Sequence, residues 1–167
     1  MPKAEPKQKP KQKPKPKSKP ARAARLSLSL ESKTESADRA ELRVIEFAGN
    51  AGCDEWQCHE IGLAVREAVA NAVLHGNRHD AKKKVLLKAE MGKDELHISI
   101  RDEGEGFDPD DLPNPLQDNG LLRESGRGVF LVKACMDEVA VRRVASGGTE
   151  VILRKHISST PARRKTK

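Results

Sequence analysis

Two pairs of short, strand-like segments constrain the fold of this chain more than any other feature of its sequence. Residues 83–91 and 95–103 flank the turn Gly92-Lys93-Asp94, and residues 138–144 and 149–155 flank a second short turn that contains glycine. Strands joined by such short connections run antiparallel as hairpins, because a parallel pair needs a crossover of a dozen or more residues. The two hairpins therefore disfavour a Rossmann fold, in which strands and helices alternate.

One further strand and three helices are expected in the rest of the foldable chain. Residues 24–32 alternate Leu with Ser, which is the period of a half-buried strand. Helices are expected at residues 35–52, with Ser36 as a possible N-cap, from about residue 54 to residue 75, and at residues 126–139. This order predicts an α+β fold, a two-layer α/β sandwich in which a mixed, mainly antiparallel sheet has helices on one face.

The two ends of the chain account for its basic charge. The formal net charge is +7, but residues 1–25 contribute +9 and residues 156–167 contribute +4, which leaves −6 on residues 26–155. Residues 1–24 are rich in Lys and Pro and nearly lack apolar side chains, so they cannot bury enough surface to offset the entropy of ordering. We expect a disordered tail at 1–24, a folded domain at 25–155, and a disordered basic tail at the C-terminus from residue 156.

Several classes of protein are disfavoured by composition. No apolar run approaches the roughly 20 residues of a membrane-spanning helix, and no apolar segment of a signal peptide follows the N-terminal charges. The three cysteines are an odd number without CxxC spacing, which favours reduced thiols in a cytoplasmic protein over a disulfide framework or a zinc site. Contact with nucleic acid through the basic tails remains an alternative function, because such contact depends mainly on charge.

The predicted helix that ends near residue 75 carries three polar side chains at intervals of four. Glu67, Asn71 and His75 would share one face of an otherwise apolar helix. An Asn carbonyl oxygen can bind Mg²⁺, and a Glu one turn earlier can accept a proton from a nucleophile beside that metal. Taken alone, this helix favours the simpler interpretation, an exposed Glu/Asn pair with ordinary surface hydrogen bonds.

Two segments downstream combine glycines with groups that could bind a nucleotide. Asp102 ends a predicted strand and could accept a hydrogen bond from an exocyclic amine such as that of adenine, while Gly104 and Gly106 would let the base approach the backbone. Gly126 and Gly128 open a predicted helix, whose first N–H groups can bind phosphate oxygens. Each pattern alone is also compatible with an acidic glycine loop or with a helix that simply follows a loop.

Three more residues belong to these candidate segments. Arg123 and Arg127 could add positive charge near the start of that helix, and Thr149 follows Gly148 where the last predicted strand begins. A Gly-Thr pair at this position is by itself only a tight turn.

The order of the four segments is more informative than any one of them. A Glu/Asn helix, strand-Asp-x-Gly-x-Gly, Gly-x-Gly-helix and Gly-Thr-strand closely resembles the N, G1, G2 and G3 boxes of the GHKL superfamily, which includes histidine-kinase catalytic domains, Hsp90, type II topoisomerases and MutL. The resemblance covers roughly residues 25–155. The segments REAVANAVLHGN and ESGRGVFLVKACMDEVAV look most like the small anti-sigma-factor serine kinases of the RsbW type.

The resemblance implies ATP and Mg²⁺ as cofactors and gives each candidate residue a role. Glu67 would be the catalytic base that faces the γ-phosphate and the acceptor hydroxyl, Asn71 would bind Mg²⁺, and Asp102 would accept a hydrogen bond from the adenine amine. Residues 108–125 would form a lid over the nucleotide. The remaining expected contacts are Gly104 and Gly106 at the base, Arg123, Gly126, Arg127 and Gly128 near the phosphates, and Thr149 near the adenine.

The same resemblance implies partners. The protein would be a serine/threonine kinase that phosphorylates an anti-sigma factor antagonist of the STAS type and sequesters a sigma factor, as a homodimer. The alternatives are a non-catalytic, ATP-dependent regulatory protein of the same fold, and a nucleic-acid-associated protein that acts through its basic tails.

Overall fold

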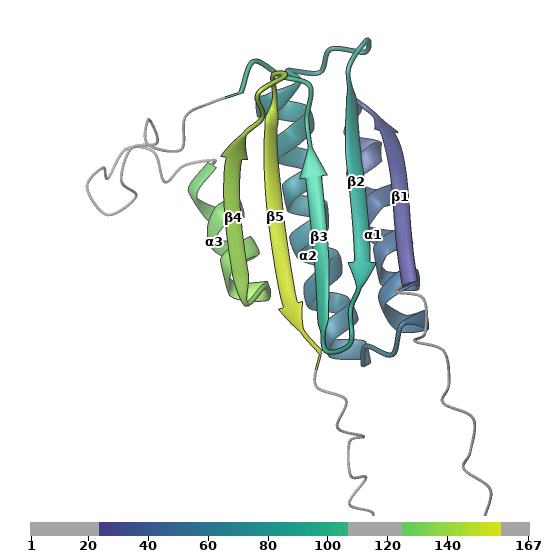
Figure 1. Ribbon diagram of the computed structural model, residues 1–167. Helices are drawn as coiled ribbons and strands as arrows, with labels where there is room; N and C mark the ends of the chain where they lie inside the picture. The colour runs from purple at the N-terminus through teal and green to yellow at the C-terminus, as the bar shows by residue number, and fades with distance from the viewer. Residues whose placement is uncertain (1–23, 107–124, 158–167) are drawn as a thin grey trace, which may run out of the picture.

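The computed structural model describes residues 24–106 and 125–157 (Figure 1). The expected N-terminal tail, C-terminal tail and nucleotide lid lie almost entirely outside these ranges. The elements are β1 (Ala24–Glu31), α1 (Glu35–Asn50), α2 (Glu55–Asn71), the short π-helix η1 (Ala72–Gly76), β2 (Lys84–Met91), β3 (Glu95–Arg101), α3 (Ser125–Cys135), β4 (Glu138–Arg143) and β5 (Thr149–His156).

The five described strands form one sheet in the order β1-β2-β3-β5-β4. Both predicted hairpins are present, β2 with β3 and β4 with β5, and every described pairing is antiparallel. Helices α1 and α2 lie on one face of this sheet, and α3 lies beside its β4 edge (Figure 1). The predicted two-layer α+β sandwich is confirmed.

The central pairing of the sheet determines where the candidate site lies. β3 and β5 are far apart in sequence but adjacent in space, with Arg101 opposite Glu150. The residues that flank this pair, Asp102 and Thr149, therefore meet at one end of the sheet. Because β5 pairs with β3 on one side and with β4 on the other, the hairpin of β4 and β5 brings Gly148 and Thr149 next to Asp102.

The core lies between the sheet and the helices α1 and α2. Alternate residues of β2 and β3 are buried, as expected for strands with one covered face, and α2 buries positions at helical spacing. Burial of each large apolar side chain contributes about 1.5–3 kcal/mol. The largest fully buried side chains are Leu30, Ile61, Leu87, Leu96, Ile98, Ile100, Leu153, Val44, Val65, Val69, Val73 and Val85.

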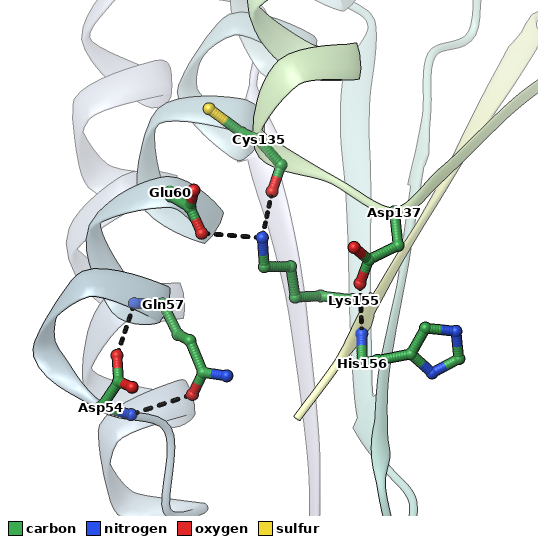
Figure 2. A network of polar contacts seen from close by, with 7 residues as sticks. All are labelled: Asp54, Gln57, Glu60, Cys135, Asp137, Lys155 and His156. Carbon is green, nitrogen blue, oxygen red and sulfur yellow. Dashed lines mark hydrogen bonds and ion pairs between the residues drawn. The ribbon is translucent and has the colours of Figure 1, made fainter. Parts of the chain in front are cut away.

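The starts of the two long helices differ in how well the sequence predicts them. α2 begins with a capping box, in which the Gln57 backbone N–H donates to Asp54 Oδ1 at 2.8 Å and the Asp54 N–H donates to Gln57 Oε1 at 3.1 Å (Figure 2). The expected N-cap of α1 at Ser36 is wrong. The chain already turns at Lys33, so Ser36 is buried inside the first helical turn and its N–H donates to the Lys33 carbonyl.

Two other sequence-based expectations concern thiols and membranes. Cys53, Cys58 and Cys135 are free thiols, and burial raises the pKa of each, to about 11 for Cys53. Low reactivity is expected of thiols whose pKa is raised in this way. None of the helices in the described ranges is long and apolar enough to cross a membrane.

Candidate functional site

The carboxylate of Asp102 is buried and held in one orientation by backbone groups. Its Oδ1 accepts hydrogen bonds from the N–H groups of Gly104, at 2.8 Å, and Thr149, at 3.1 Å. The Asp102 N–H also donates to the Thr149 carbonyl at 3.0 Å. Both hydrogen bonds to the carboxylate from described residues end on Oδ1, while Oδ2 lies against Gly76. Asp102 can therefore present Oδ2 as an acceptor in a fixed position.

Glycines allow three stretches of backbone to pack around this carboxylate. A Cβ built on Gly76 would lie 2.5 Å from Asp102 Oδ2, and one on Gly104 would lie 2.9 Å from Asp102 Oδ1. Gly148 has φ +88°, which L side chains rarely adopt, and its Cβ would lie 3.0 Å from the Asp102 carbonyl carbon. A side chain at any of these positions would displace the carboxylate or its neighbours.

Gly106 is also closely packed, but against the backbone of Gly148 and not against Asp102 itself. It has φ +74°, and a Cβ there would lie 2.8 Å from the Gly148 carbonyl oxygen. The expected base-side residues Asp102, Gly104, Gly106 and Thr149 are thus brought together by the structure. Gly76 joins them, although no pattern in the sequence assigned it a role.

Glu67 lies in the last turn of α2, against the start of α3. A Cβ built on Gly128 would lie 2.5 Å from Glu67 Cδ and 3.1 Å from its Cγ, so the carboxylate rests directly on the glycine backbone. The simpler interpretation, a surface Glu/Asn pair, does not predict this contact. Gly126 and Arg127 fall in the first turn of α3, where only the backbone is described, and Arg123 lies outside the described residues.

Asn71 lies between these two contacts along the helix. It is the last residue of α2, one turn after Glu67 on the same face, and it is partly exposed. The helix then widens into η1, where the Asn77 N–H donates to the Ala72 carbonyl. Short π-helices of this kind are frequent at functional sites. His75, in η1, is exposed.

The described residues contain no cluster of three or more His, Cys, Asp or Glu side chains that could hold a metal ion. A site built from Asn71 is of a different kind, because Mg²⁺ commonly takes one or two protein oxygens and completes its coordination with water and phosphate. The chemistry of this donor fits Mg²⁺ bound together with a nucleotide.

Asn77 is a structural residue of the site that sequence reasoning missed. It is completely buried, its Nδ2 donates to the Lys84 carbonyl at 3.0 Å, and its Oδ1 accepts from the Glu103 N–H at 2.8 Å. It therefore ties the end of η1 to the start of β2 and to the segment that follows β3. This connection holds Gly76 against Asp102.

A second polar network fixes the far end of α3 (Figure 2). Lys155 Nζ, on β5, donates to Glu60 Oε2 on α2 and to the carbonyl of Cys135, both at 2.7 Å. Cys135 is the last residue of α3, where a cation is favourable for the helix dipole. The side chains of Lys155 and Glu60 are only 12% and 22% exposed, so the pair is well shielded from solvent. It anchors α3, whose other end carries Gly128.

The backbone is strained immediately beside the site. Arg78 and His79 follow Asn77 with φ 54° and 56°, a conformation that non-glycine residues seldom adopt. An open cavity of about 190 Å³ lies here, lined by Gly76, Asn77, Arg78, Asp80, Lys83 and Glu105.

Comparisons with known proteins identify the family to which the chain is similar. The histidine kinase-like ATPase domain family matches residues 30–155. The chain is 31% identical over 139 residues to an anti-sigma F factor of Geobacillus thermodenitrificans, covering 82% of this chain and 95% of that protein. It is 33% identical over 139 residues to an anti-sigma F factor of Halalkalibacterium halodurans, covering 82% and 94%.

A solved structure shares the fold. The crystal structure of the RsbU and RsbW domains of Rv1364c from Mycobacterium tuberculosis aligns with a TM-score of 0.59 and 21% identity. The alignment covers 80% of this chain but only 32% of that longer one. From its family match and its relatives over nearly their whole length, this chain belongs to the histidine kinase-like ATPase domain family.

Proposed function

We propose that this protein is an ATP-dependent serine/threonine kinase and anti-sigma factor, which phosphorylates an antagonist protein of the STAS type and sequesters a sigma factor. The observation that carries the proposal is the alignment of one helix with two glycine segments. Glu67 of α2 lies against Gly128, Asn71 follows one turn later, and Gly76 at the end of η1 lies against Asp102. Relatives named anti-sigma F factor, at 31–33% identity, support the assignment.

The base of ATP would be recognised at the Asp102 end. Backbone N–H groups occupy Oδ1, so Oδ2 would accept a hydrogen bond from the adenine amine. Thr149, which is buried beside it, and the glycines Gly104 and Gly106 would shape the pocket for the base.

The phosphates would lie near the first turn of α3. N–H groups at the start of a helix are natural ligands for phosphate oxygens, and Gly126 and Gly128 give the nucleotide access to that backbone. Arg123 and Arg127 would add positive charge. Asn71 would hold Mg²⁺, which when bound neutralises phosphate charge.

Glu67 would act on the protein substrate. A Ser or Thr hydroxyl of the antagonist would approach the γ-phosphate in line, and the Glu67 carboxylate would orient that hydroxyl and accept its proton. Phosphoryl transfer of this kind depends mostly on positioning and on electrostatic stabilisation. The contact with Gly128 holds the carboxylate in place before substrate arrives.

Partner switching would follow from charge. A phosphate on the antagonist adds nearly two negative charges, which would weaken its hold on the kinase and leave the kinase free to bind the sigma factor. ATP, sigma factors and antagonists all occur in the cytoplasm, where we place the protein. We assign the activity to residues 25–155, so deletion of residues 1–24 should leave phosphoryl transfer unchanged.

The test is transfer of γ-labelled phosphate from ATP to candidate antagonists by the wild-type protein and by E67Q. We expect E67Q to bind ATP normally and to lose transfer. Equal transfer by both proteins would favour a different catalytic group, and ATP binding without transfer to any antagonist would favour the non-catalytic regulatory protein. Absence of ATP binding by the wild type would refute the assignment as a whole.

The nucleic-acid alternative has a separate test. If the tails bind nucleic acid, DNA binding should fall steeply with salt and should disappear when residues 1–24 are deleted.

A further inference from the structure

The face of the sheet that points away from α1 and α2 is covered by no described element (Figure 1). Its side chains alternate with the buried ones along each strand, and the register of the pairings orders them in rows that cross the strands. The middle row consists of Ser27, Lys88, Ser99, Ile152 and Ala140. Apart from Lys88 and Ile152, these side chains are small.

Longer side chains lie on both sides of the middle row. One flanking row consists of Arg25, Glu90, His97, Arg154 and Glu138. The other flanking row consists of Ser29, Leu86, Arg101, Glu150 and Arg142. An open cavity of about 500 Å³ lies over the middle row, and its lining includes Ser27, Lys88 and Ser99. We call this cavity and the middle row beneath it the open-face groove.

The two carboxylates that line the open-face groove, those of Glu90 and Glu150, already have partners. Glu90 accepts a hydrogen bond from Arg25 at 2.9 Å. Glu150 accepts hydrogen bonds from Arg142 Nε and from the Ser99 hydroxyl, both at 2.6 Å. Neither carboxylate is therefore left to bind a cation, and a ligand of the groove would meet mainly donor groups.

Lys88 lies in the middle row with an exposed side chain that forms no ion pair or hydrogen bond with another described residue. In the three rows together, five Lys or Arg side chains outnumber three Glu side chains. Residues 26–155 as a whole carry a net charge of −6. The open face thus has the opposite sign from the domain, with a free ammonium group in its groove.

The charge and the openness of the groove decide between possible occupants. The basic tails of this chain have the same sign as the groove and would be repelled. Nucleic acid is bound through many phosphate contacts or through aromatic stacking, whereas these rows have an excess of only two positive charges and no Phe, Tyr or Trp. Sites for small molecules usually bury most of the ligand, which an open cavity on a sheet cannot do. An acidic segment of a protein fits both the charge and the shape.

We propose that the open-face groove binds an acidic segment of a partner protein, which crosses the strands and places a Glu or Asp side chain on Lys88. Neighbouring strands lie about 4.7–4.9 Å apart, so Ile152, two strands from Lys88, is roughly 10 Å away. In a polyproline II segment, side chains repeat every three residues at about 3.1 Å per residue. An apolar side chain three positions from the acidic one would therefore reach Ile152. The proposal does not depend on the proposed function, and its test needs no nucleotide.

A set of synthetic peptides tests the chemistry of the occupant. The probe is the acetylated peptide Glu-Glu-Ser-Gln-Ile-Ser, titrated into the full-length protein labelled with ¹⁵N. It should shift the backbone amide resonances of Lys88 and Ser99, and the Kd is read from these resonances, so that contacts with the basic tails are recorded separately. A peptide with Gln in place of both Glu residues should bind about tenfold more weakly, and one with Ser in place of Ile about fivefold more weakly.

Substitution of Lys88 tests the position of the acidic side chain. K88Q should raise the Kd of the Glu peptide by about tenfold, because it removes the only free ammonium group of the groove, and K88R should restore binding. The matched control is K82Q, which removes the same charge from an exposed residue between η1 and β2. Its Kd should equal that of the wild type.

Four results would overturn the proposal. They are shifts confined to the tails, equal binding of the Glu and Gln peptides, an equal Kd for the Glu peptide in K88Q and K82Q, and free glutamate that binds as tightly as the peptide. A single-stranded oligonucleotide that shifts the same amides at lower concentration than the peptide would overturn it as well. Loss of ATP binding or phosphoryl transfer with intact peptide binding would count against the proposed function only.

Discussion

Replacement of Asp102 by Asn changes the chemistry of the candidate base site with almost no change in shape. The N–H groups of Gly104 and Thr149 both point at Oδ1, so the amide of D102N must place its oxygen there. Its NH₂ group then occupies the position of Oδ2. The variant exchanges an acceptor for a donor at the one atom that we assign to the adenine amine.

The expected loss follows from that single exchange. A hydrogen bond to a charged group contributes about 1.5–3 kcal/mol, which corresponds to a roughly ten- to hundredfold rise in the Kd for ATP. Guanine carries an acceptor, O6, where adenine carries its amine, so D102N should bind GTP better relative to ATP than the wild type does. The weaker hydrogen bonds to Oδ1 should lower the free energy of unfolding by about 1 kcal/mol.

Calorimetric titration with ATP and with GTP measures both effects. D137N is the matched control, because Asp137 also accepts a hydrogen bond from a backbone N–H, that of His156 at 2.6 Å, but lies just past the far end of α3, away from Asp102 (Figure 2). Its nucleotide affinities should stay at wild-type values. A folded D102N with unchanged affinity for ATP would show that Oδ2 does not contact the base, and the reasoning would fail.

Three more substitutions probe other parts of the structure. G128A forces the Glu67 carboxylate to move by about 1 Å, which should slow phosphoryl transfer by about a hundredfold, while thermal stability is retained because Ala favours helix. The control is G49A, whose Cβ meets only Cys58 Sγ at 3.8 Å, and it should keep both the rate of transfer and the thermal stability. An equal rate of transfer in the two variants would contradict the contact between Gly128 and Glu67. K155M should lower the free energy of unfolding in urea by about 2 kcal/mol and weaken ATP binding, while K155R should be closer to wild type in both measurements. If K155M had the stability and the ATP affinity of the wild type, the pair with Glu60 would not anchor α3. Burial alone would raise the pKa of Glu150, but hydrogen bonds from Ser99 and Arg142 outweigh it and lower that pKa from 4.5. The ionised carboxylate therefore stabilises the fold above pH 4.5, and this stabilisation is lost as the pH falls through the lower pKa of the folded state; E150Q should lose less stability on acidification than wild type in thermal melts, and parallel pH profiles would refute the assignment.

The fold was predictable because its main signals are local. Alternation of apolar residues and short turns define both hairpins, and the apolar face of residues 55–71 defines α2. The end of α3 was harder to predict from the sequence. The expected helix ran to residue 139, but it ends at Cys135, because the Asp137 N–H donates to the Arg154 carbonyl as the sheet begins. The N-cap at Ser36 failed for a local reason, since the Ser36 N–H donates to the Lys33 carbonyl and α1 has already begun at Glu35.

The candidate site was predictable only in part. The order of segments in the sequence indicated Glu67, Asp102 and Thr149, and the pairing of β3 with β5 brings the last two together. Nothing local shows that Asn77 would be buried with two hydrogen bonds or that Lys155 would reach Glu60, because both depend on segments distant in sequence. The roles of Arg123 and Arg127 stay predictions.

A crystal structure of the protein with Mg²⁺ and a non-hydrolysable ATP analogue would test the binding of nucleotide between α2 and the two glycine segments most directly. We predict the adenine amine on Oδ2 of Asp102, Mg²⁺ on the side-chain oxygen of Asn71, and the terminal phosphate between Glu67 and the first turn of α3. A nucleotide bound elsewhere, or no nucleotide at saturating concentration, would contradict this arrangement.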